Sequence, residues 1–199
     1  GWSHGDDELF TTEQAIEWFD LDHAGRGASR FDFDKLQSVN SHYIQQADDN
    51  RLVEMIRKPL AEFSGRDLDA TDLERLAVAM PELKKRGKTI LQIIDNAKFI
   101  VSQRPIEIDG KGADILTDDA RLLLQELKAV LGEISDWQLQ PIENAIRDFA
   151  TSKDVKLGKI AQPIRVSLTG TTTSPGIFDL MLILGREESI GRIGDVTGR

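Results

Sequence analysis

Residues 161–185 read AQPIRVSLTGTTTSPGIFDLMLILG. Two apolar runs flank a row of four hydroxyl side chains, which are Thr171, Thr172, Thr173 and Ser174. Gly170 suits the end of the first run as a helix C-cap. Ser174 as N-cap, with Pro175 in the first helical position, predicts that a second helix starts there. The stretch therefore predicts two apolar helices joined by a hydroxyl-rich turn.

Helix signals of the same kind continue outward from this stretch. Apolar residues recur at helical spacing in residues 33–47, which is typical of a helix with one buried face. Helix starts are predicted where a hydroxyl residue stands three positions before Glu or Gln; these pairs are Thr11 with Gln14, Thr71 with Glu74, Thr89 with Gln92, and Ser135 with Gln138. No segment alternates convincingly between apolar and polar residues, so we predict an all-α array of about ten helices.

Two turn-rich segments divide this array. Residues 62–67 (EFSGRD) and 108–114 (IDGKGAD) carry linker signals, and residues 102–116 as a whole are predicted to form a loop. The sequence thus predicts three helical parts, residues 1–65, 66–110 and 111–199.

Charge is distributed unevenly along the 199 residues. The net charge is −9, but all the excess acid lies in residues 1–80, with 17 acidic and 8 basic side chains, whereas residues 81–199 carry 17 of each. Residues 84–88 (KKRGK) hold four cations in five positions, and a second basic cluster spans residues 153–165. Because local patches decide whether a polyanion binds, the acidic total does not exclude a nucleic-acid partner.

Other features limit the classes of protein that fit. The chain has no cysteine, which excludes disulfides, thiol chemistry and cysteine-ligated zinc and suits a cytoplasmic protein. No stretch approaches the roughly 18 apolar residues that span a bilayer. The start, GWSHGDDELF, has neither Met nor a signal peptide; we expect that it is a cut inside a longer protein.

Motifs for catalysis or metal binding fail on inspection. Residues 20–25 (DLDHAG) imitate the start of a calcium loop, but Phe31 stands where the bidentate Glu is required. The three histidines lie far apart, and the glycine-rich end GRIGDVTGR lacks the Lys-Ser/Thr pair of a phosphate loop. We therefore predict neither catalytic residues nor a metal site in this chain.

Three stretches together carry a resemblance to a known family. These are GWSHGDDELFTTEQAIEWFDL (1–21), RFDFDKLQSVNSHYI (30–44) and KLGKIAQPIRVSLTGTTTSPGIFDLMLILGREESIGRI (156–193), and PELKKRGKTILQI (81–93) matches more loosely. They resemble the part of bacterial glutamyl-tRNA synthetases that follows the ATP-binding signature loop. The resemblance covers essentially the whole chain, and its C-terminal piece is the most specific.

The resemblance implies the C-terminal part of a class I synthetase. The two catalytic motifs of the family are absent from these residues, so ATP and magnesium would belong to a catalytic domain outside this chain. Residues 1–65 would complete the stem-contact domain, and residues 66–110 and 111–199 would be two anticodon-binding subdomains. The parent enzyme would attach glutamate to tRNA, act as a cytoplasmic monomer, and involve neither DNA nor a membrane. Recognition of the glutamate tRNA alone, or of the glutamine tRNA as well, stays open.

The resemblance also implies site residues. Arg165, Ser174 and Ile177 match positions that contact the anticodon in the family, and Thr173 and Pro175 complete the turn. Arg86 is our candidate for the third anticodon base, with Lys84 or Lys85 as alternatives. Possible contacts with the tRNA backbone are assigned to four side chains, which are Lys84, Lys85, Tyr43 and Lys159.

Simpler interpretations stay open for each motif. The hydroxyl turn could be a plain capped connection, the 84–88 cluster a solvated helix end, and Tyr43 a packing residue. The three tryptophans are expected to pack in a core and not to stack on bases. For the whole chain, the alternative is a non-catalytic helical scaffold that binds another protein.

Overall fold

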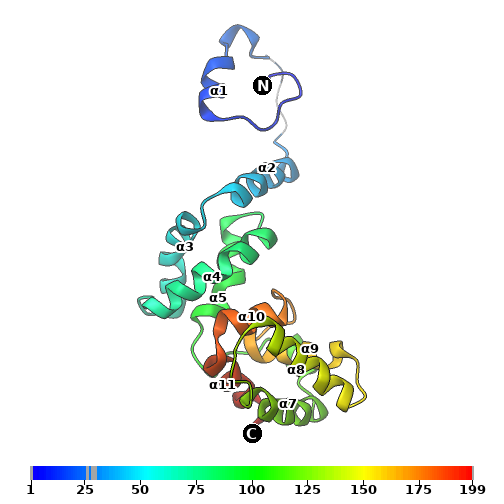
Figure 1. The fold of residues 1–199 in the computed structure, drawn as a ribbon. Helices are drawn as coiled ribbons and strands as arrows, with labels where there is room; N and C mark the ends of the chain where they lie inside the picture. The colour runs from blue at the N-terminus through cyan, green and yellow to red at the C-terminus, as the bar shows by residue number, and fades with distance from the viewer. Residues whose placement is uncertain (1, 26, 28–30, 199) are drawn as a thin grey trace.

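The computed structural model describes residues 2–25, 27 and 31–198. In these residues the chain forms eleven α-helices and one short 3-10 helix and contains no strand (Figure 1). The all-α prediction is confirmed. The helices are α1 (Thr12–Trp18), η1 (Leu21–His23), α2 (Phe33–Gln46), α3 (Asp49–Ser64), α4 (Ala70–Arg86), α5 (Ile90–Val101), α6 (Gly110–Ile115), α7 (Asp118–Gly132), α8 (Leu139–Ser152), α9 (Leu157–Thr169), α10 (Ile177–Leu184) and α11 (Arg186–Thr197).

The helices form an elongated array with the two ends of the chain far apart (Figure 1). Helices α3, α4 and α5 pack on one another, and α7 to α11 form a second group in which α9 contacts α7, α8, α10 and α11. Helix α10 also packs on α4 and so joins the two groups. The turn between α9 and α10 is therefore held close to the C-terminal end of α4.

A single hydrophobic core runs through both groups, from Ile44 in α2 to Val196 in α11. Helices α2 to α5 and α7 to α11 contribute buried apolar residues to it, as the periodicity predicts. The boundaries between 65 and 66 and between 110 and 111 stay predictions. Helix α3, before the first boundary, packs on α4 and α5 beyond it.

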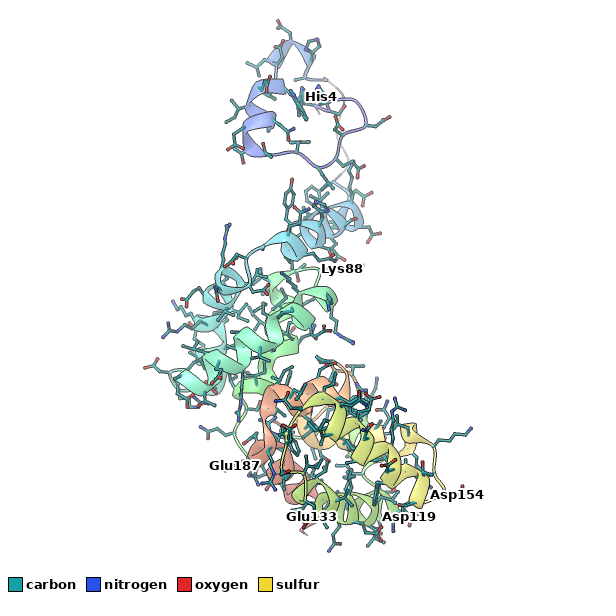
Figure 2. All side chains as sticks on the ribbon, in the orientation of Figure 1. His4, Lys88, Asp119, Glu133, Asp154 and Glu187 are labelled. Atoms are coloured by element: carbon teal, nitrogen blue, oxygen red, sulfur yellow. The ribbon has the colours of Figure 1, made fainter. Side chains whose placement is uncertain are left out.

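The N-terminal segment forms a small cluster of its own (Figure 2). Trp2 packs edge-on against Phe10 and Phe19, and Trp18 packs on Phe10. The segment is tied to α2 where the Tyr43 hydroxyl donates to the Phe10 carbonyl at 2.8 Å. In contrast, Trp137 packs against the main core and donates its Nε1 to the Met181 carbonyl at 3.0 Å.

Two of the four predicted helix starts are confirmed and two are wrong. Thr11 and Thr89 are N-caps that accept from the main-chain N–H three residues later. Helix α4 instead begins after Asp69, whose carboxylate and that of Asp72 form the capping box. Asp72 also receives a bidentate pair of hydrogen bonds from Arg66, and such charge-assisted bonds fix its carboxylate in the capping position. Helix α8 starts after Gln138, with no side-chain cap, and not after Ser135.

Two further local predictions need correction. The predicted loop 102–116 contains the short helix α6, which is capped by Asp109 and packs on α9. Helix α10 begins at Ile177 after Gly176, so Ser174 is not its N-cap and Pro175 is not its first residue. The Ser174 hydroxyl is engaged elsewhere, because it receives a hydrogen bond from Arg165 at 2.9 Å.

Candidate functional site

The turn between α9 and α10 starts from a left-handed glycine. Gly170 ends α9 with φ of 77°, and a Cβ there would collide with the carbonyl oxygen of Glu107. The Gly170 carbonyl accepts from the Asp109 N–H at 3.0 Å. Position 170 therefore requires glycine, because the 102–109 segment passes too close to the turn to leave room for a side chain.

The threonines of the turn divide into structural and exposed groups. The Thr169 hydroxyl donates to the Arg165 carbonyl at 2.9 Å, and the Thr171 hydroxyl donates to the Thr173 carbonyl at 2.8 Å. The Thr173 side chain is exposed and makes no hydrogen bond with the residues that the structure describes. The turn is therefore held by its own hydroxyls and presents Thr173 to solvent.

Two arginines converge on Ser174. Arg86, the last residue of α4, donates from Nη1 to the Ser174 carbonyl at 3.2 Å. Arg165 on α9 donates from Nη1 to the same carbonyl at 3.3 Å, to the Ser174 hydroxyl at 2.9 Å and to the Pro175 carbonyl at 3.2 Å. The structure thus brings together Arg86, Arg165, Ser174 and Pro175, which the sequence places in one site only by resemblance.

Neither arginine of this pair has a carboxylate partner among the described residues. The Arg165 Nε is buried and makes no hydrogen bond. Burial, together with the like charge of Arg86, lowers the pKa of Arg165 below its usual value. A half-buried cation without a counter-ion is unfavourable in the isolated protein, and a bound anion would relieve it.

Helix α10 adds unpaired donors to the same place. Its N-terminus has no side-chain cap. The main-chain N–H groups of its first turn have no acceptor within the helix, and the positive end of the helix dipole lies at the same place. Ile177, the first residue, is only 5% exposed and belongs to the core. The RNA contact predicted for Ile177 stays a prediction, and it would have to be made by the main chain.

One carboxylate lies near this N-terminus. Burial and the neighbouring Glu82 raise the pKa of Asp179, against the opposing effect of Arg86 and Lys85. A Cβ on Gly176 would lie 2.6 Å from the Asp179 Oδ2, so the carboxylate lies beside the N-terminus of α10.

The remaining predicted residues lie outside this cluster. The Lys84 ammonium is paired with Asp49 and donates to the Ala47 carbonyl, and Lys85 pairs with Glu82 at 2.6 Å. Lys159 is exposed in the first turn of α9, beside a separate hollow. Tyr43 is partly exposed but its hydroxyl is bound to Phe10.

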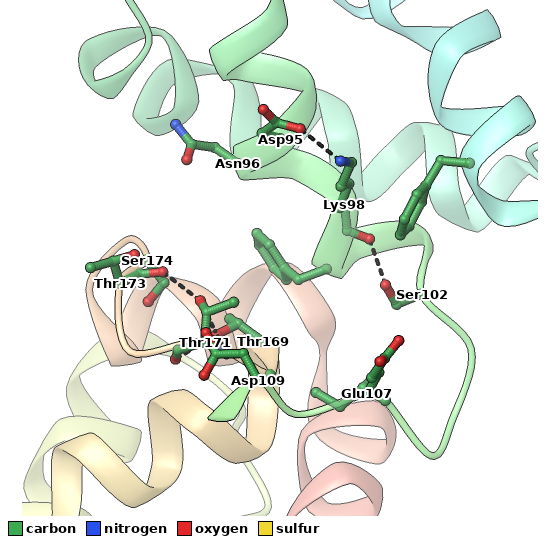
Figure 3. Close-up of a pocket in the computed structure, with 14 residues that line it drawn as sticks. Asp95, Asn96, Lys98, Ser102, Glu107, Asp109, Thr169, Thr171, Thr173 and Ser174 are labelled. Atoms are coloured by element: carbon green, nitrogen blue, oxygen red, sulfur yellow. Dashed lines mark hydrogen bonds and ion pairs between the residues drawn. The ribbon is translucent and has the colours of Figure 1, made fainter. Parts of the chain in front are cut away.

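A cleft beside the hydroxyl turn was not found from the sequence. It has a volume of about 400 Å³ and lies between α5 and the turn (Figure 3). Its lining includes Phe63, Asn96, Lys98 and the hydroxyl residues Thr171, Thr173 and Ser174. Polar residues on one face of α5 were the available signal, because Gln92 and Asn96 lie one helical turn apart.

The described residues offer neither a metal-binding cluster nor a membrane-spanning helix. They hold no group of three His, Asp or Glu side chains placed to bind a metal ion. None of the described helices has the length and apolar character needed to cross a membrane.

Known proteins provide an independent comparison. The chain is 48% identical over 200 residues to glutamate–tRNA ligase 2 of Chelativorans sp. (strain BNC1), a match that covers 98% of this chain and 42% of the relative. It is 46% identical over 203 residues to glutamate–tRNA ligase 2 of Brucella ovis, covering 100% and 43%. The chain therefore spans less than half the length of these curated relatives.

Solved structures and a family model agree with these relatives. The crystal structure of a glutamate tRNA ligase from Elizabethkingia meningosepticum, in complex with its amino acid, superposes with a TM-score of 0.80 at 26% identity and covers 100% of this chain and 39% of that one. These matches confirm the predicted resemblance to glutamyl-tRNA synthetases, and none of them favours the scaffold alternative. A family model described as "Anticodon binding domain" matches residues 51–197. Because this match covers well over half of its length, the chain belongs to the anticodon-binding domain family.

Proposed function

We propose that this chain recognises the anticodon loop of a tRNA through Arg86, Arg165 and the turn at Ser174. The observation that carries the proposal is that two arginines, neither with a carboxylate partner among the residues that the structure describes, converge on one hydroxyl-rich turn. Anticodon loops present unpaired bases and closely spaced phosphates, which proteins bind by hydrogen bonds to base edges and by Arg contacts.

Each group has a distinct part in this proposal. Arg165 supplies the charge, because its guanidinium has no carboxylate partner and its buried Nε makes no hydrogen bond among the described residues. Arg86 reads the third anticodon base in preference to Lys84 or Lys85, because it alone of the three contacts Ser174, while both lysines are paired with acids. The Thr173 hydroxyl and the uncapped N–H groups of α10 donate to base acceptors or to a phosphate. The Ser174 hydroxyl receives a hydrogen bond from Arg165 and donates to the Pro175 carbonyl, so it holds the turn in place for the RNA.

The rest of the proposal concerns the longer protein. We infer that this chain is part of a glutamate–tRNA ligase that works in the cytoplasm as a monomer and attaches glutamate to its tRNA with ATP. Residues 1–65 would be the remainder of the tRNA stem-contact domain. Tyr43, in that part, and Lys159, outside it, would lie near the tRNA backbone. ATP and Mg²⁺ would bind to a catalytic domain outside this chain. Charging of the glutamine tRNA is a further activity to test with the parent.

Fluorescence anisotropy tests the proposal. A labelled anticodon stem-loop of the glutamate tRNA should bind more tightly than a hairpin with the same stem and a scrambled loop. The affinity for both should fall as salt rises, because phosphate contacts release counter-ions. Equal affinity for the two hairpins at low salt would contradict the proposal, because stem charge alone would then explain binding.

A further inference from the structure

We propose that the cleft between α5 and the hydroxyl turn binds one additional unpaired base of the RNA, stacked on Phe63 and read by Asn96. This inference rests on the proposed function and adds a subsite to it. Figure 3 shows the cleft, with Asp95, Asn96 and Lys98 of α5 on one wall and the hydroxyl turn on the other.

The cleft is continuous with the two-arginine site. Ser174, which accepts hydrogen bonds from Arg86 and Arg165, lines it. Asp95 and Asn96 also line a neighbouring hollow that contains Arg86 and Lys88. An RNA strand held at Arg86 and Arg165 would therefore pass the opening of the cleft with its next nucleotide.

An exposed aromatic ring stands at one side of this opening. Phe63, near the end of α3, is 50% exposed, whereas Phe99, which also lines the cleft, is 6% exposed and belongs to the core. The Lys98 Nζ lies 5.1 Å from the centre of the Phe63 ring, and no aromatic side chain among the described residues packs on that ring. Exposed aromatic rings beside basic residues are the stacking surfaces of proteins that bind single strands.

Asn96 supplies a group suited to a base edge. Its amide is exposed and makes no hydrogen bond within the described part of the chain. An amide offers both donors and an acceptor, which is the combination that pairs with the edge of a nucleobase.

The charges of the cleft favour a base over a phosphate. Lys98 is paired with Asp95 at 2.7 Å, and Glu107 and Asp109 line the cleft as well. Acids outnumber the one cation, so a phosphate would be repelled. A base with an exocyclic amino group can donate to these carboxylates, so we expect adenine, cytosine or guanine here and not uracil.

Single abasic substitutions along the loop test the subsite. Phe63→Ala and Asn96→Ala should each weaken binding of the intact anticodon stem-loop at least five-fold. At one loop position, removal of the base should weaken wild-type binding by a similar factor and leave Phe63→Ala with no further loss. Uracil at that position should behave like the abasic site. Met55→Ala, an exposed apolar side chain on α3 outside the cleft, should bind like the wild type.

The outcomes separate this inference from the proposed function. If Phe63→Ala and Asn96→Ala bind like the wild type while Arg165→Ala is weakened, the subsite is absent and anticodon recognition at the turn stands. If the wild type does not prefer the anticodon loop over a scrambled loop, both proposals fail. Because both substituted side chains are exposed, loss of folding will not imitate the expected result, and thermal melting of each variant verifies this.

Discussion

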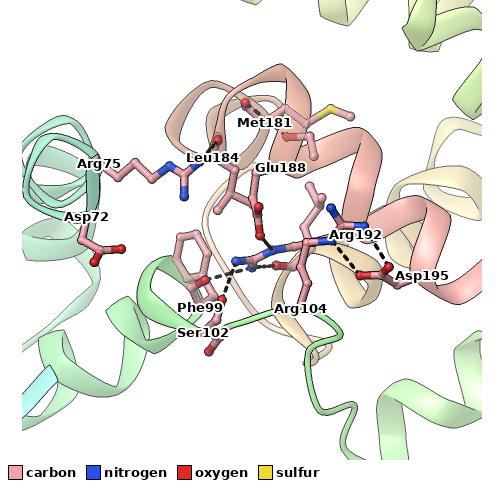
Figure 4. Close-up of polar contacts among 12 residues, drawn as sticks. Asp72, Arg75, Phe99, Ser102, Arg104, Met181, Leu184, Glu188, Arg192 and Asp195 are labelled. Carbon is pink, nitrogen blue, oxygen red and sulfur yellow. Dashed lines mark hydrogen bonds and ion pairs between the residues drawn. The ribbon is translucent and has the colours of Figure 1, made fainter. Parts of the chain in front are cut away.

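Arg165 and Arg192 lie on α9 and α11, two helices that pack on each other, but their guanidinium groups have different kinds of partner. Arg192 is 1% exposed; it pairs with Glu188 at 2.7 Å and donates to the carbonyls of Phe99, Leu168 and Ser102 (Figure 4). Arg165 is less deeply buried, yet within the described part of the chain it has no carboxylate partner and its Nε makes no hydrogen bond. Both guanidinium groups lie at least partly inside the protein, but the charge of Arg192 has a carboxylate partner and that of Arg165 has none among the described residues.

The Arg192 region ties the ends of three helices together. It links α11 to the C-terminal end of α5 and to α9 two residues before Gly170. Beside it, Arg104 makes a bidentate pair with Asp195, with both N–O distances 2.8 Å. A charge saturated in this way stabilises the fold and fixes where the hydroxyl turn begins, whereas the unsaturated charge at Arg165 is left for a ligand.

The largest expected effect concerns the saturated arginine. Arg192→Met leaves the Glu188 carboxylate and three carbonyls without their donor, so the free energy of unfolding should fall by about 3 kcal/mol or more. The melting temperature should drop by roughly 6 to 12 °C. Arg57→Met, which removes an exposed arginine on α3, is the control and should change little. A melting temperature of Arg192→Met equal to that of the control would contradict the claim that the paired charge of Arg192 stabilises the fold.

Gly170→Ala tests how strictly the turn is fixed. The left-handed φ and the clash with the Glu107 carbonyl should together cost about 2 kcal/mol in unfolding free energy. RNA affinity should fall as well, because relief of this clash would displace the turn that Arg86 and Arg165 contact. Urea unfolding and anisotropy measure the two effects. Gly132→Ala, where a Cβ meets nothing within 4 Å, is the control and should be neutral or stabilising. An equal change in unfolding free energy for both variants would contradict the requirement for glycine at position 170.

The Arg104–Asp195 pair should make the stability of the fold depend on pH. Hydrogen bonds from Arg104 lower the pKa of Asp195 below its usual range, with burial opposing them. A lowered carboxyl pKa gives stability that is present above the unfolded value of about 3.9 and is lost as the pH falls through the folded value. Asp195→Asn should therefore cost about 0.5–1 kcal/mol at pH 7, and the difference from wild type should shrink toward pH 3 in urea unfolding. A difference that is constant with pH would contradict the assignment.

The smallest expected effect is a change in RNA affinity on substitution of Asp179. Asp179→Asn removes a negative charge near Arg86 and the start of α10, so the affinity for the anticodon stem-loop should rise about two-fold at pH 7. Since the pKa of Asp179 is raised, its protonation begins at a higher pH than for an ordinary carboxyl. Wild-type binding should thus approach that of the variant as the pH falls. Weaker binding by Asp179→Asn would indicate that this carboxylate accepts hydrogen bonds from the RNA.

Local features were predictable from the sequence. Helical periodicity, the caps at Thr11 and Thr89, and the turn after Gly170 depend on residues a few positions apart, and the structure has them. Ser174 was misplaced as a cap because its hydroxyl is occupied by Arg165, nine residues earlier, a contact that propensity rules do not include.

Features that depend on tertiary packing were not predictable in the same way. Arg86 and Ser174 are 88 positions apart, so only the resemblance to a family placed them in one site. Arg192 stands in a polar stretch, REESIGRIG, that gives no sign of burial, and its partners come from α5 and α9. Phe63 and Asn96 likewise reach one cleft only after α3 and α5 pack against each other.

The central claim is that the unsaturated arginine binds RNA while the saturated one maintains the fold. Anisotropy with the labelled anticodon stem-loop, comparing wild type, Arg165→Ala and Arg57→Ala, tests it most directly when each protein is also melted. We predict that Arg165→Ala weakens binding at least ten-fold, about 1.4 kcal/mol, with its melting temperature unchanged or raised, and that Arg57→Ala binds like the wild type. Unchanged RNA affinity of Arg165→Ala, or a loss of affinity that follows a loss of folding, would contradict the claim.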